Sequence, residues 1–438
     1  MKVTVSGMGY VGLVTGIALS HIGHTVTCVD VDKKKIKMLK NGISPIYEPG
    51  LEEFMKKNHN KITYTTDYKR AYSTSDIIII GVGTPEKQDG SANLDYVYLV
   101  CNQIVESLEK DCVVVIKSTV PIGTNDDIER KLNKMVKKGI KVYVVSNPEF
   151  LSQGTAIHDT LFSSRIVIGT DNEYASSVMY KLYEPLMNSP YNVPYLVTSR
   201  KSAEMIKYAS NDFLALKISY INEIANLCKT LGANVEEVSK GMSLDPRIGK
   251  NFLKAGIGYG GSCFPKDTKA LHCLSVVNGI ELKTIKACIA VNESQKLILF
   301  NQLKNDLGDL HSKTIAVLGL TFKPNTDDLR DAPSIINIKK LLFFGANVKA
   351  YDPVGINNFK NNLKSFDINN DCNLQFYESI DDTVRNADAA MIMTEWSSIV
   401  NYDISKYKKL MKEPRIYDGR NCYKLEDMKN MLYFSIGR

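Results

Sequence analysis

Residues 2–12 read Lys2-Val3-Thr4-Val5-Ser6-Gly7-Met8-Gly9-Tyr10-Val11-Gly12, an apolar run that ends in three spaced glycines. The run predicts a buried β-strand over Lys2–Ser6, and the residues that follow Gly9 predict a helix. Between a strand and a helix, GxGxxG is typical of dinucleotide binding: Gly7 permits a tight turn, Gly9 lets the backbone approach a pyrophosphate, and Gly12 allows close packing. The alternative is a tight turn without a ligand.

Asp30 closes a second predicted strand, 18 residues after Gly12. This spacing suits a carboxylate that bonds the adenosine ribose hydroxyls, and a carboxylate there would repel a 2′-phosphate, which favours NAD over NADP. Lys33 to Lys35 lie close by and leave that preference open. Gly83-Thr84-Pro85 and Ser118-Thr119-Val120-Pro121 follow later predicted strands, where ligands bind in such sheets, although ordinary turns explain them equally well.

The alternation of β-rich runs and helical patterns over the first ~190 residues predicts a parallel α/β sheet. A helical pattern over 200–232 follows, with Gly232 as its stop, and could join two domains and supply a dimer surface. A second α/β unit begins at Lys313. We therefore expect an α/β protein with two Rossmann-like doubly wound domains, joined by a long central helix and a small helical domain. The expected parts are residues 1–198, 199–300 and 311–438.

Individual elements follow from the same patterns. A helix is expected over Ser334–Phe344, closed by Gly345, and the Asn/Lys/Asp-rich region 357–373 is expected to be a surface loop. The predicted strands are Lys2–Ser6, Thr25–Asp30, Ile77–Val82, Val113–Ser118, Val142–Ser146, Thr314–Leu318, Val348–Tyr351, Ala387–Thr394 and Arg415–Tyr417.

Composition excludes several classes of protein. The 438 residues are 44% apolar and 24% charged, as in globular proteins, and the net charge of +7 is spread along the chain rather than gathered on a nucleic-acid surface. Nine cysteines without CxxC pairs and only six histidines indicate neither a metal site nor a disulfide framework. No signal peptide or membrane span is evident, so we expect a cytoplasmic protein without a membrane partner.

The stretch that carries the clearest chemistry is Gly258-Tyr259-Gly260-Gly261-Ser262-Cys263-Phe264-Pro265-Lys266-Asp267. Its glycines let the backbone pass close to a ligand. Lys266 would favour the thiolate of Cys263, the nucleophilic form, and Asp267 is a candidate general base or proton relay. The alternative is a tight turn around a buried cysteine.

Three other groups could take part in a reaction. Glu149, in Asn147-Pro148-Glu149-Phe150, follows a predicted strand and could activate water. Lys207 and Asn211 are four apart on the long predicted helix, so they share a face and could stabilise an oxyanion, unless they are a surface pair. Lys323 and Arg330 flank a polar loop and could hold phosphates.

Taken together, these motifs resemble the family of UDP-sugar dehydrogenases over nearly the whole chain. The resemblance rests on motifs that occur in the family's order: Gly7–Gly12, Tyr47-Glu48-Pro49-Gly50, Gly83–Pro85, Ser118–Pro121, Asn147–Phe150, residues 256–267, and Phe322–Arg330. Asn147–Leu151 followed by Gly154 and Ala156 is similar to the glucose-oxidising branch, because the N-acetylhexosamine branch usually has Arg at the position of Phe150.

The resemblance implies that a primary alcohol of UDP-glucose is oxidised twice, with two NAD molecules in turn and without release of the aldehyde. Cys263 then resembles the nucleophile that forms a thiohemiacetal and later a thioester. Glu149 matches the hydrolytic base and Asp267 the proton relay. Lys207 and Asn211 match the oxyanion-stabilising pair, and Thr119 matches a residue that touches both water and cofactor.

The resemblance also assigns binding residues and a homodimer or higher homo-oligomer. Residues 1–198 would bind NAD, 199–300 would dimerise, and 311–438 would bind the UDP-sugar. Arg247 resembles a residue that reaches into the neighbouring subunit's sugar site. Gln153 stands where many members have Glu, so its cofactor contact is less secure. The expected cofactor contacts are Gly7, Gly9, Tyr10, Val11, Gly12, Asp30, Lys35, Thr84, Thr119, Gln153, Lys266 and Arg330; the expected substrate contacts are Glu149, Phe150, Leu151, Ser152, Gln153, Lys207, Asn211, Arg247, Phe252, Leu253, Lys254, Ala255, Gly256, Gly260, Lys323 and Arg420.

Two other functions stay open at this point. A one-step hydroxyacid dehydrogenase also places Lys and Asn four apart on a helix after a Rossmann domain, but it needs no thiol. A binding or regulatory module would bind NAD or a nucleotide without turnover. Within the family, another UDP-hexose, such as a UDP-N-acetylhexosamine, or GDP-mannose is the alternative substrate.

Overall fold

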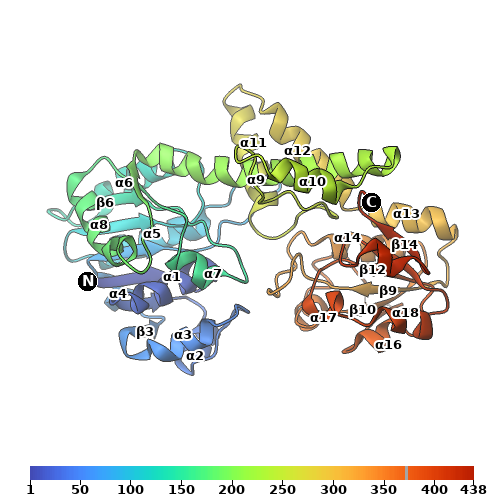
Figure 1. The fold of residues 1–438 in the computed structure, drawn as a ribbon. Coiled ribbons are helices and arrows are strands. Elements are labelled where there is room, and N and C mark those ends of the chain that lie inside the picture. The colour runs from blue at the N-terminus through green and yellow to red at the C-terminus, as the bar shows by residue number, and fades with distance from the viewer. Residues whose placement is uncertain (370–372) are drawn as a thin grey trace. The chain divides into compact units, whose positions relative to one another are not determined.

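The computed structural model describes residues 1–369 and 373–438. The chain divides into two compact units, Met1–Ser210 and Asn211–Arg438. The helix α9 (Arg200–Leu231) begins in the first unit and ends in the second. The expected fold class, two α/β sheets and a long helix, is confirmed (Figure 1). The finer division into three parts stays a prediction.

The first unit is built on an eight-stranded sheet in the order β3-β2-β1-β4-β5-β6-β7-β8. Strands β1 to β6 are parallel, and β7 joins β6 in antiparallel fashion. The chain crosses over between β1 and β4, the kind of switch point at which such sheets bind ligands. The strands are β1 (Lys2–Ser6), β2 (Thr25–Val29), β3 (Ile62–Thr65), β4 (Ile77–Ile80), β5 (Cys112–Ile116), β6 (Val142–Ser146), β7 (Ile166–Gly169) and β8 (Tyr195–Thr198).

Both faces of this sheet are buried. In β4, Ile77 and Ile79 belong to the apolar core on one face, while Ile78 and Ile80 belong to the core on the other. Such continuous apolar runs are typical of strands that helices cover on both sides. The helices are α1 (Tyr10–His21), α2 (Lys33–Lys40), α3 (Leu51–Lys57), α4 (Tyr68–Ser73), α5 (Asp95–Ser107), α6 (Thr124–Met135), α7 (Ala156–Leu161) and α8 (Glu173–Met187).

The second unit repeats the architecture with a six-stranded parallel sheet in the order β11-β10-β9-β12-β13-β14. Its strands are β9 (Thr314–Leu318), β10 (Asn347–Tyr351), β11 (Leu374–Phe376), β12 (Ala389–Ile392), β13 (Arg415–Asp418) and β14 (Leu432–Ser435). Its helices after α9 are α10 (Val235–Ser243), α11 (Phe264–Val277), α12 (Lys283–Gln295), α13 (Ile298–Leu307), α14 (Pro333–Phe343), α15 (Ile356–Asn361), α16 (Ile380–Val384), α17 (Ser397–Val400) and α18 (Ile404–Leu410).

One element prediction is wrong. The region 357–373 was expected to be a surface loop, yet α15 occupies its first residues and buries Phe359 completely. Phe359 packs against the rings of Phe366 and Phe376, and Leu363 and Ile368 are buried in the same core, so a few apolar side chains anchor a segment that is otherwise rich in polar residues. Residues 370–372 of this prediction lie outside the described part of the chain.

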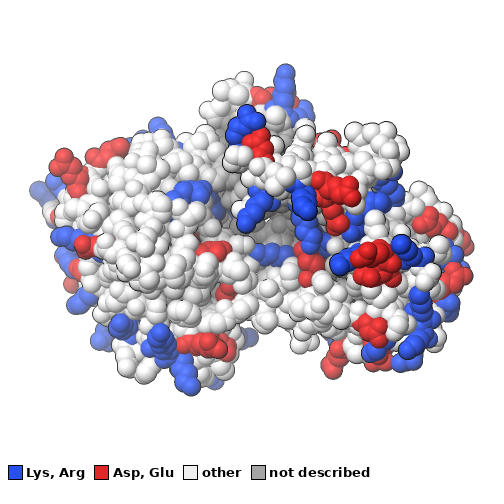
Figure 2. Space-filling view, in the orientation of Figure 1, with Lys and Arg blue, Asp and Glu red and all other residues white. Residues whose placement is uncertain are grey.

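No helix in the described part of the chain has the length and apolarity needed to cross a membrane. Within residues 1–369 and 373–438, no His, Cys, Asp or Glu side chains gather in threes as a metal site would require. On the face shown in Figure 2, acidic and basic side chains are mixed on both units.

Candidate active site

The glycine loop after β1 has the geometry that its sequence predicts. Gly7 has a φ of +92°, which only glycine adopts without strain, and a Cβ at Gly12 would collide with the Gly7 carbonyl oxygen. A Cβ at Gly9, by contrast, would meet no atom within 4 Å. The backbone at Gly9, which precedes α1, is therefore open to a ligand, and the helix N-terminus there suits a phosphate.

Asp30 lies directly against this loop. Its Oδ2 accepts a hydrogen bond of 2.7 Å from the Met8 N–H, and its Oδ1 accepts one of 2.9 Å from the Asp32 N–H. Asp32 caps α2, the helix that carries Lys35. The carboxylate is thus fixed at the end of β2, where the predicted ribose contact requires it.

The loops after β4 and β5 are tied to each other. Thr84 Oγ1 donates to the Thr119 carbonyl oxygen at 2.9 Å, and Ser118 Oγ donates to the Val82 carbonyl oxygen at 2.6 Å. The two predicted cofactor residues, Thr84 and Thr119, therefore lie together at the carboxyl edge of the sheet. Their contacts with a cofactor stay predictions.

Glu149 and Lys207 form a buried ion pair in the first unit. Lys207 Nζ donates to Glu149 Oε1 at 2.9 Å and to the Glu149 carbonyl oxygen at 2.7 Å, while the Leu151 N–H donates to Oε2 at 2.8 Å. Both side chains are almost fully buried. The ring of Phe150 lies under two cations: the Lys207 ammonium is 5.5 Å from the ring centre, and the carbon of the Arg165 guanidinium is 3.9 Å from it. The geometry joins a candidate base to a fixed positive charge.

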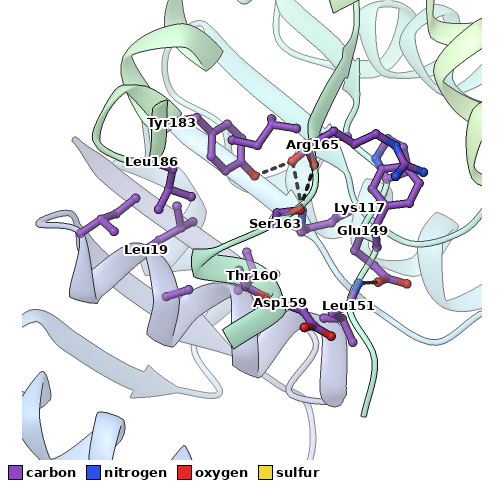
Figure 3. Close-up of a pocket in the computed structure, with 17 residues that line it drawn as sticks. Leu19, Lys117, Glu149, Leu151, Asp159, Thr160, Ser163, Arg165, Tyr183 and Leu186 are labelled. Carbon is purple, nitrogen blue, oxygen red and sulfur yellow. Dashed lines mark hydrogen bonds between the residues drawn. The ribbon is translucent and has the colours of Figure 1, made fainter. Parts of the chain in front are cut away.

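A second buried lysine, Lys117, lies beside this pair and was missed by sequence reasoning. Its Nζ donates to Asn147 Oδ1 at 3.2 Å, and the Tyr183 hydroxyl donates to the same oxygen at 2.5 Å. Burial lowers the pKa of Lys117 to about 8, against the opposing effect of Glu149. Figure 3 shows Lys117, Glu149, Arg165 and Tyr183 among the side chains that line a small cavity. The signal that could have found it is a lysine near the end of the predicted buried strand Val113–Ser118.

Two buried glutamates hold the loops that carry predicted site residues. Glu48 accepts hydrogen bonds of 2.7 Å from the N–H groups of Gly154 and Ala156, which fixes the segment after Gln153. Glu204, on α9, accepts from the N–H groups of Gly123 and Asn125 at 2.6 and 2.8 Å, at the start of α6. A carboxylate at a helix N-terminus is favourable, which explains how these acids stabilise the loops.

In the second unit, Cys263 immediately precedes α11 as its N-cap residue and is only partly buried. A thiol at a helix N-terminus is favoured as the thiolate, because the N–H dipoles face it. The loop before it is held by side-chain amides: Asn222 accepts from the Gly256 N–H at 2.9 Å, Gln295 donates to the Gly256 carbonyl oxygen at 2.7 Å, and Asn292 bonds both sides of Tyr259.

Asp267 is the centre of a buried network behind this thiol. Its Oδ1 accepts from Lys266 Nζ at 2.5 Å and its Oδ2 accepts from Asn211 Nδ2 at 2.7 Å. Lys266, which was expected to favour the Cys263 thiolate, therefore gives its charge to Asp267. Lys207 and Asn211, expected as one pair, are each bonded to a different carboxylate, although both lie on α9.

The remaining residues of the second unit that were predicted to bind substrate or cofactor differ in burial and in their partners. Arg420 donates to the carbonyl oxygens of Met393 and Phe322 at 2.8 and 3.1 Å, and a Cβ at Gly260 would collide with the Asp331 carbonyl. Arg330 pairs with Asp328 in a bidentate arrangement. Leu253, Ala255 and Gly256 are buried, whereas Phe252, Lys254 and Arg247 are exposed; Lys323 lies over the Phe322 ring.

Comparison with known proteins accounts for the whole chain. Three models of the UDP-glucose/GDP-mannose dehydrogenase family match it: the NAD binding domain over residues 1–187, the central domain over 201–294 and the UDP binding domain over 316–425. The chain is 46% identical over 444 aligned residues to UDP-glucose 6-dehydrogenase YwqF of Bacillus subtilis, covering 100% of this chain and 98% of the relative. It is 44% identical to the UDP-glucose 6-dehydrogenase of Rhizobium meliloti, covering 100% of both chains.

Solved structures agree with this result. A UDP-glucose dehydrogenase from Pyrobaculum islandicum superposes with a TM-score of 0.90 at 34% identity, covering 99% of this chain and 96% of that one. A UDP-D-ManNAc dehydrogenase from Pyrococcus horikoshii gives a TM-score of 0.87 at 26% identity, covering 100% and 99%.

Proposed function

The chain belongs to the UDP-glucose/GDP-mannose dehydrogenase family and is an oxidoreductase with a nicotinamide dinucleotide-binding domain, and we propose that it oxidises UDP-glucose to UDP-glucuronate. The observation that carries the proposal is Cys263 at the N-terminus of α11, with the buried Asp267 network behind it. A one-step alcohol dehydrogenase needs no such thiol. The names of the relatives and Phe150, which stands where the N-acetylhexosamine branch usually has Arg, support glucose as the sugar.

The first unit fits NAD. Gly7 and Gly12 shape the loop so that its backbone at Gly9 is open, and Asp30 is fixed beside it. Thr84, Thr119 and Lys35 lie at the same edge of the sheet. When bound, NAD accepts a hydride, and Asp30 favours it over NADP because a 2′-phosphate would meet a negative charge.

Cys263 explains how an alcohol becomes an acid. Loss of a hydride and a proton from the primary alcohol gives an aldehyde, which has no tetrahedral C–H to give up. Addition of the Cys263 sulfur to the aldehyde carbon forms a C–S bond as the C=O π bond opens, and the oxygen takes up the proton that the thiol loses, which gives a thiohemiacetal. The hydrogen on its carbon can leave as a second hydride, with loss of the hydroxyl proton. The resulting thioester is cleaved by water, which returns the free thiol.

The remaining groups are assigned to the charges and protons of these steps. Asp267 receives and returns the proton of the thiol, and Asn211, which already donates to Asp267, stabilises developing negative charge on oxygen. Glu149 activates the hydrolytic water, and Lys207 holds that carboxylate in place. Thr119 contacts both water and cofactor.

We predict that two NADH molecules are released for each UDP-glucose consumed. The double oxidation requires this ratio, because the aldehyde stays bound to Cys263 between the two hydride transfers. NADH absorbance and chromatographic quantification of UDP-glucose measure the two amounts in one reaction. A ratio of one would show a one-step dehydrogenase, and nucleotide binding without turnover would show a binding module. A parallel panel with UDP-N-acetylhexosamines and GDP-mannose tests the choice of sugar.

We also propose a homodimer in which α9 supplies the interface. The apolar side chains of Phe213, Tyr220 and Leu227 repeat every seven residues along α9 and are 61%, 49% and 54% exposed in the isolated chain. A stripe of this kind favours association of two copies. Arg247 is exposed and paired only locally with Asp245, which agrees with a role in the partner's sugar site.

The dimer predicts that Tyr220→Glu combined with Leu227→Glu yields a monomer, since two charges would have to be buried in the interface. Light scattering after size-exclusion chromatography measures the mass. Phe343→Glu is the control, because Phe343 is an apolar residue on α14 that is 81% exposed. Wild-type protein that is monomeric throughout would contradict the proposal.

A further inference from the structure

Asp212 is a buried carboxyl group that the mechanism above does not use. It follows Asn211 on α9 and is only 2% exposed. Neither of its carboxyl oxygens has a hydrogen-bond partner among the described residues. Buried acids are normally paired, because an ionised carboxylate without a partner is very unfavourable away from water. A side chain of this kind has to be explained.

The neighbours of Asp212 belong to the thiol site. Asp267 and Lys266 face it from α11, and Cys288 faces it from α12. Asp267 accepts hydrogen bonds from Lys266 and Asn211 on its own oxygens, and Lys266 is the cation that acts on Asp212. The single ammonium is therefore committed to Asp267, so the two acids cannot both be neutralised by it.

Two carboxyl groups in one buried space, with one cation between them, favour a state in which one of them keeps its proton. Asp267 is the one that is hydrogen bonded as an acceptor on both oxygens, so it is the ionised member. Asp212 is the neutral member. Burial, followed by the charge of Asp267, raises the pKa of Asp212 to about 8, and Lys266 opposes this only in part.

We propose that Asp212 and Asp267 hold one proton between them at neutral pH, carried by Asp212, and that ionisation of Asp212 sets the upper pH limit of the reaction at Cys263. A second negative charge behind Asp267 opposes the thiolate and the oxyanion that the site has to form. Asp212 acts through Asp267 and is a positioning residue. The catalytic half of this proposal rests on the function proposed above, whereas its protonation half does not.

Retention of such a group has a cost in stability. The pKa of Asp212 is raised in the folded state, so its contribution to stability is most favourable below the unfolded pKa of 3.8 and declines as the pH rises towards about 8. Residues that lower stability in this way are common where function requires them.

The protonation half is tested by infrared spectroscopy of the full chain without substrate. The carbonyl stretch of a neutral carboxylic acid is separate from that of a carboxylate. Burial also raises the pKa of Glu204, Asp327 and Asp418, so the signal of Asp212 is read from the difference between the wild type and Asp212→Asn or Asp212→Ala. We expect a neutral-acid band in both difference spectra at neutral pD and its loss as pD rises past about 8. Difference spectra without this band would overturn the proposal.

Thermal unfolding from about pH 4 to about pH 8 provides a second readout. Both variants should lose part of the decline of stability with pH, whatever their absolute stability, because neither has the titrating group. Glu223→Gln is the matched control: Glu223 is an exposed acid on the same helix, and its removal should leave the decline unchanged.

The catalytic half is tested by the pH profile of NADH release from UDP-glucose. In Asp212→Asn, the pH at which kcat falls on the alkaline side should rise by about one unit or more. In Glu223→Gln, it should not change. If the infrared band is assigned to Asp212 but the alkaline fall of kcat stays at the same pH in Asp212→Asn, then ionisation of Asp212 does not set the upper pH limit of the reaction. Absence of NADH release from the wild type would instead reject the proposed function, and the infrared result would still decide where the proton lies.

Discussion

Replacement of Cys263 by alanine is expected to lower UDP-glucuronate formation by at least about 10³-fold. The Cys263 sulfur, at the N-terminus of α11, is the nucleophile assigned to convert the aldehyde into a tetrahedral hydride donor. Binding of UDP-glucose should change little, because the side chain is small and partly exposed and the loop is held by Asn222, Asn292 and Gln295. Product is quantified by chromatography, and binding by calorimetry.

The first oxidation does not need the thiol, so Cys263→Ala should still release at most one NADH per active site in a rapid-mixing experiment. Cys273→Ala is the matched control, since Cys273 is also partly buried and lies on the same helix, α11. It should make acid at the wild-type rate. Near-normal acid formation by the Cys263 variant would remove this residue from the mechanism and favour a directly oxidised aldehyde hydrate.

The fold could be predicted because most of its strands are short apolar runs that end near a Gly, Pro, Asp or Ser residue. Lys2–Ser6, Val142–Ser146 and Thr314–Leu318 match the observed strands residue for residue. Thr25–Asp30 and Ile77–Val82 extend beyond β2 and β4 into the loops that follow, because sequence does not mark the residue at which strand pairing stops. The less apolar edge strands, among them β3 and β11, gave too weak a pattern to be predicted.

The candidate site could be predicted only as a set of positions along the chain. The order of the motifs identified Glu149, Lys207, Asn211 and Asp267. Sequence spacing could not predict which amine or amide is hydrogen bonded to which carboxylate. Those pairs join residues 56 and 58 positions apart, and they are settled by packing. Asp212 could not be found from the sequence, because what distinguishes it is that its two buried oxygens have no hydrogen-bond partner among the described residues.

Glu149→Gln is expected to accumulate a thioester on Cys263 under turnover. Glutamine keeps the length of the side chain and one oxygen for Lys207 or the Leu151 N–H, so both oxidations should proceed. It is not a base, so water is not activated and hydrolysis slows by about 10²-fold or more. Rapid mixing should show a burst of two NADH per active site followed by a slow steady rate, and intact mass spectrometry should detect the adduct.

The control for this result has to separate loss of a base from loss of a buried charge. Glu48→Gln does so, because Glu48 is as buried as Glu149 and also accepts hydrogen bonds from backbone N–H groups, those of Gly154 and Ala156, but it is not the group assigned to activate water. Its change should weaken the loop after Gln153 and raise KM without any adduct. A Glu149→Gln enzyme that shows steady release without a burst, or no adduct, would mean that another group activates the water. Lys117 would then be the next residue to test, since burial lowers its pKa to about 8 and it lines the same cavity as Glu149.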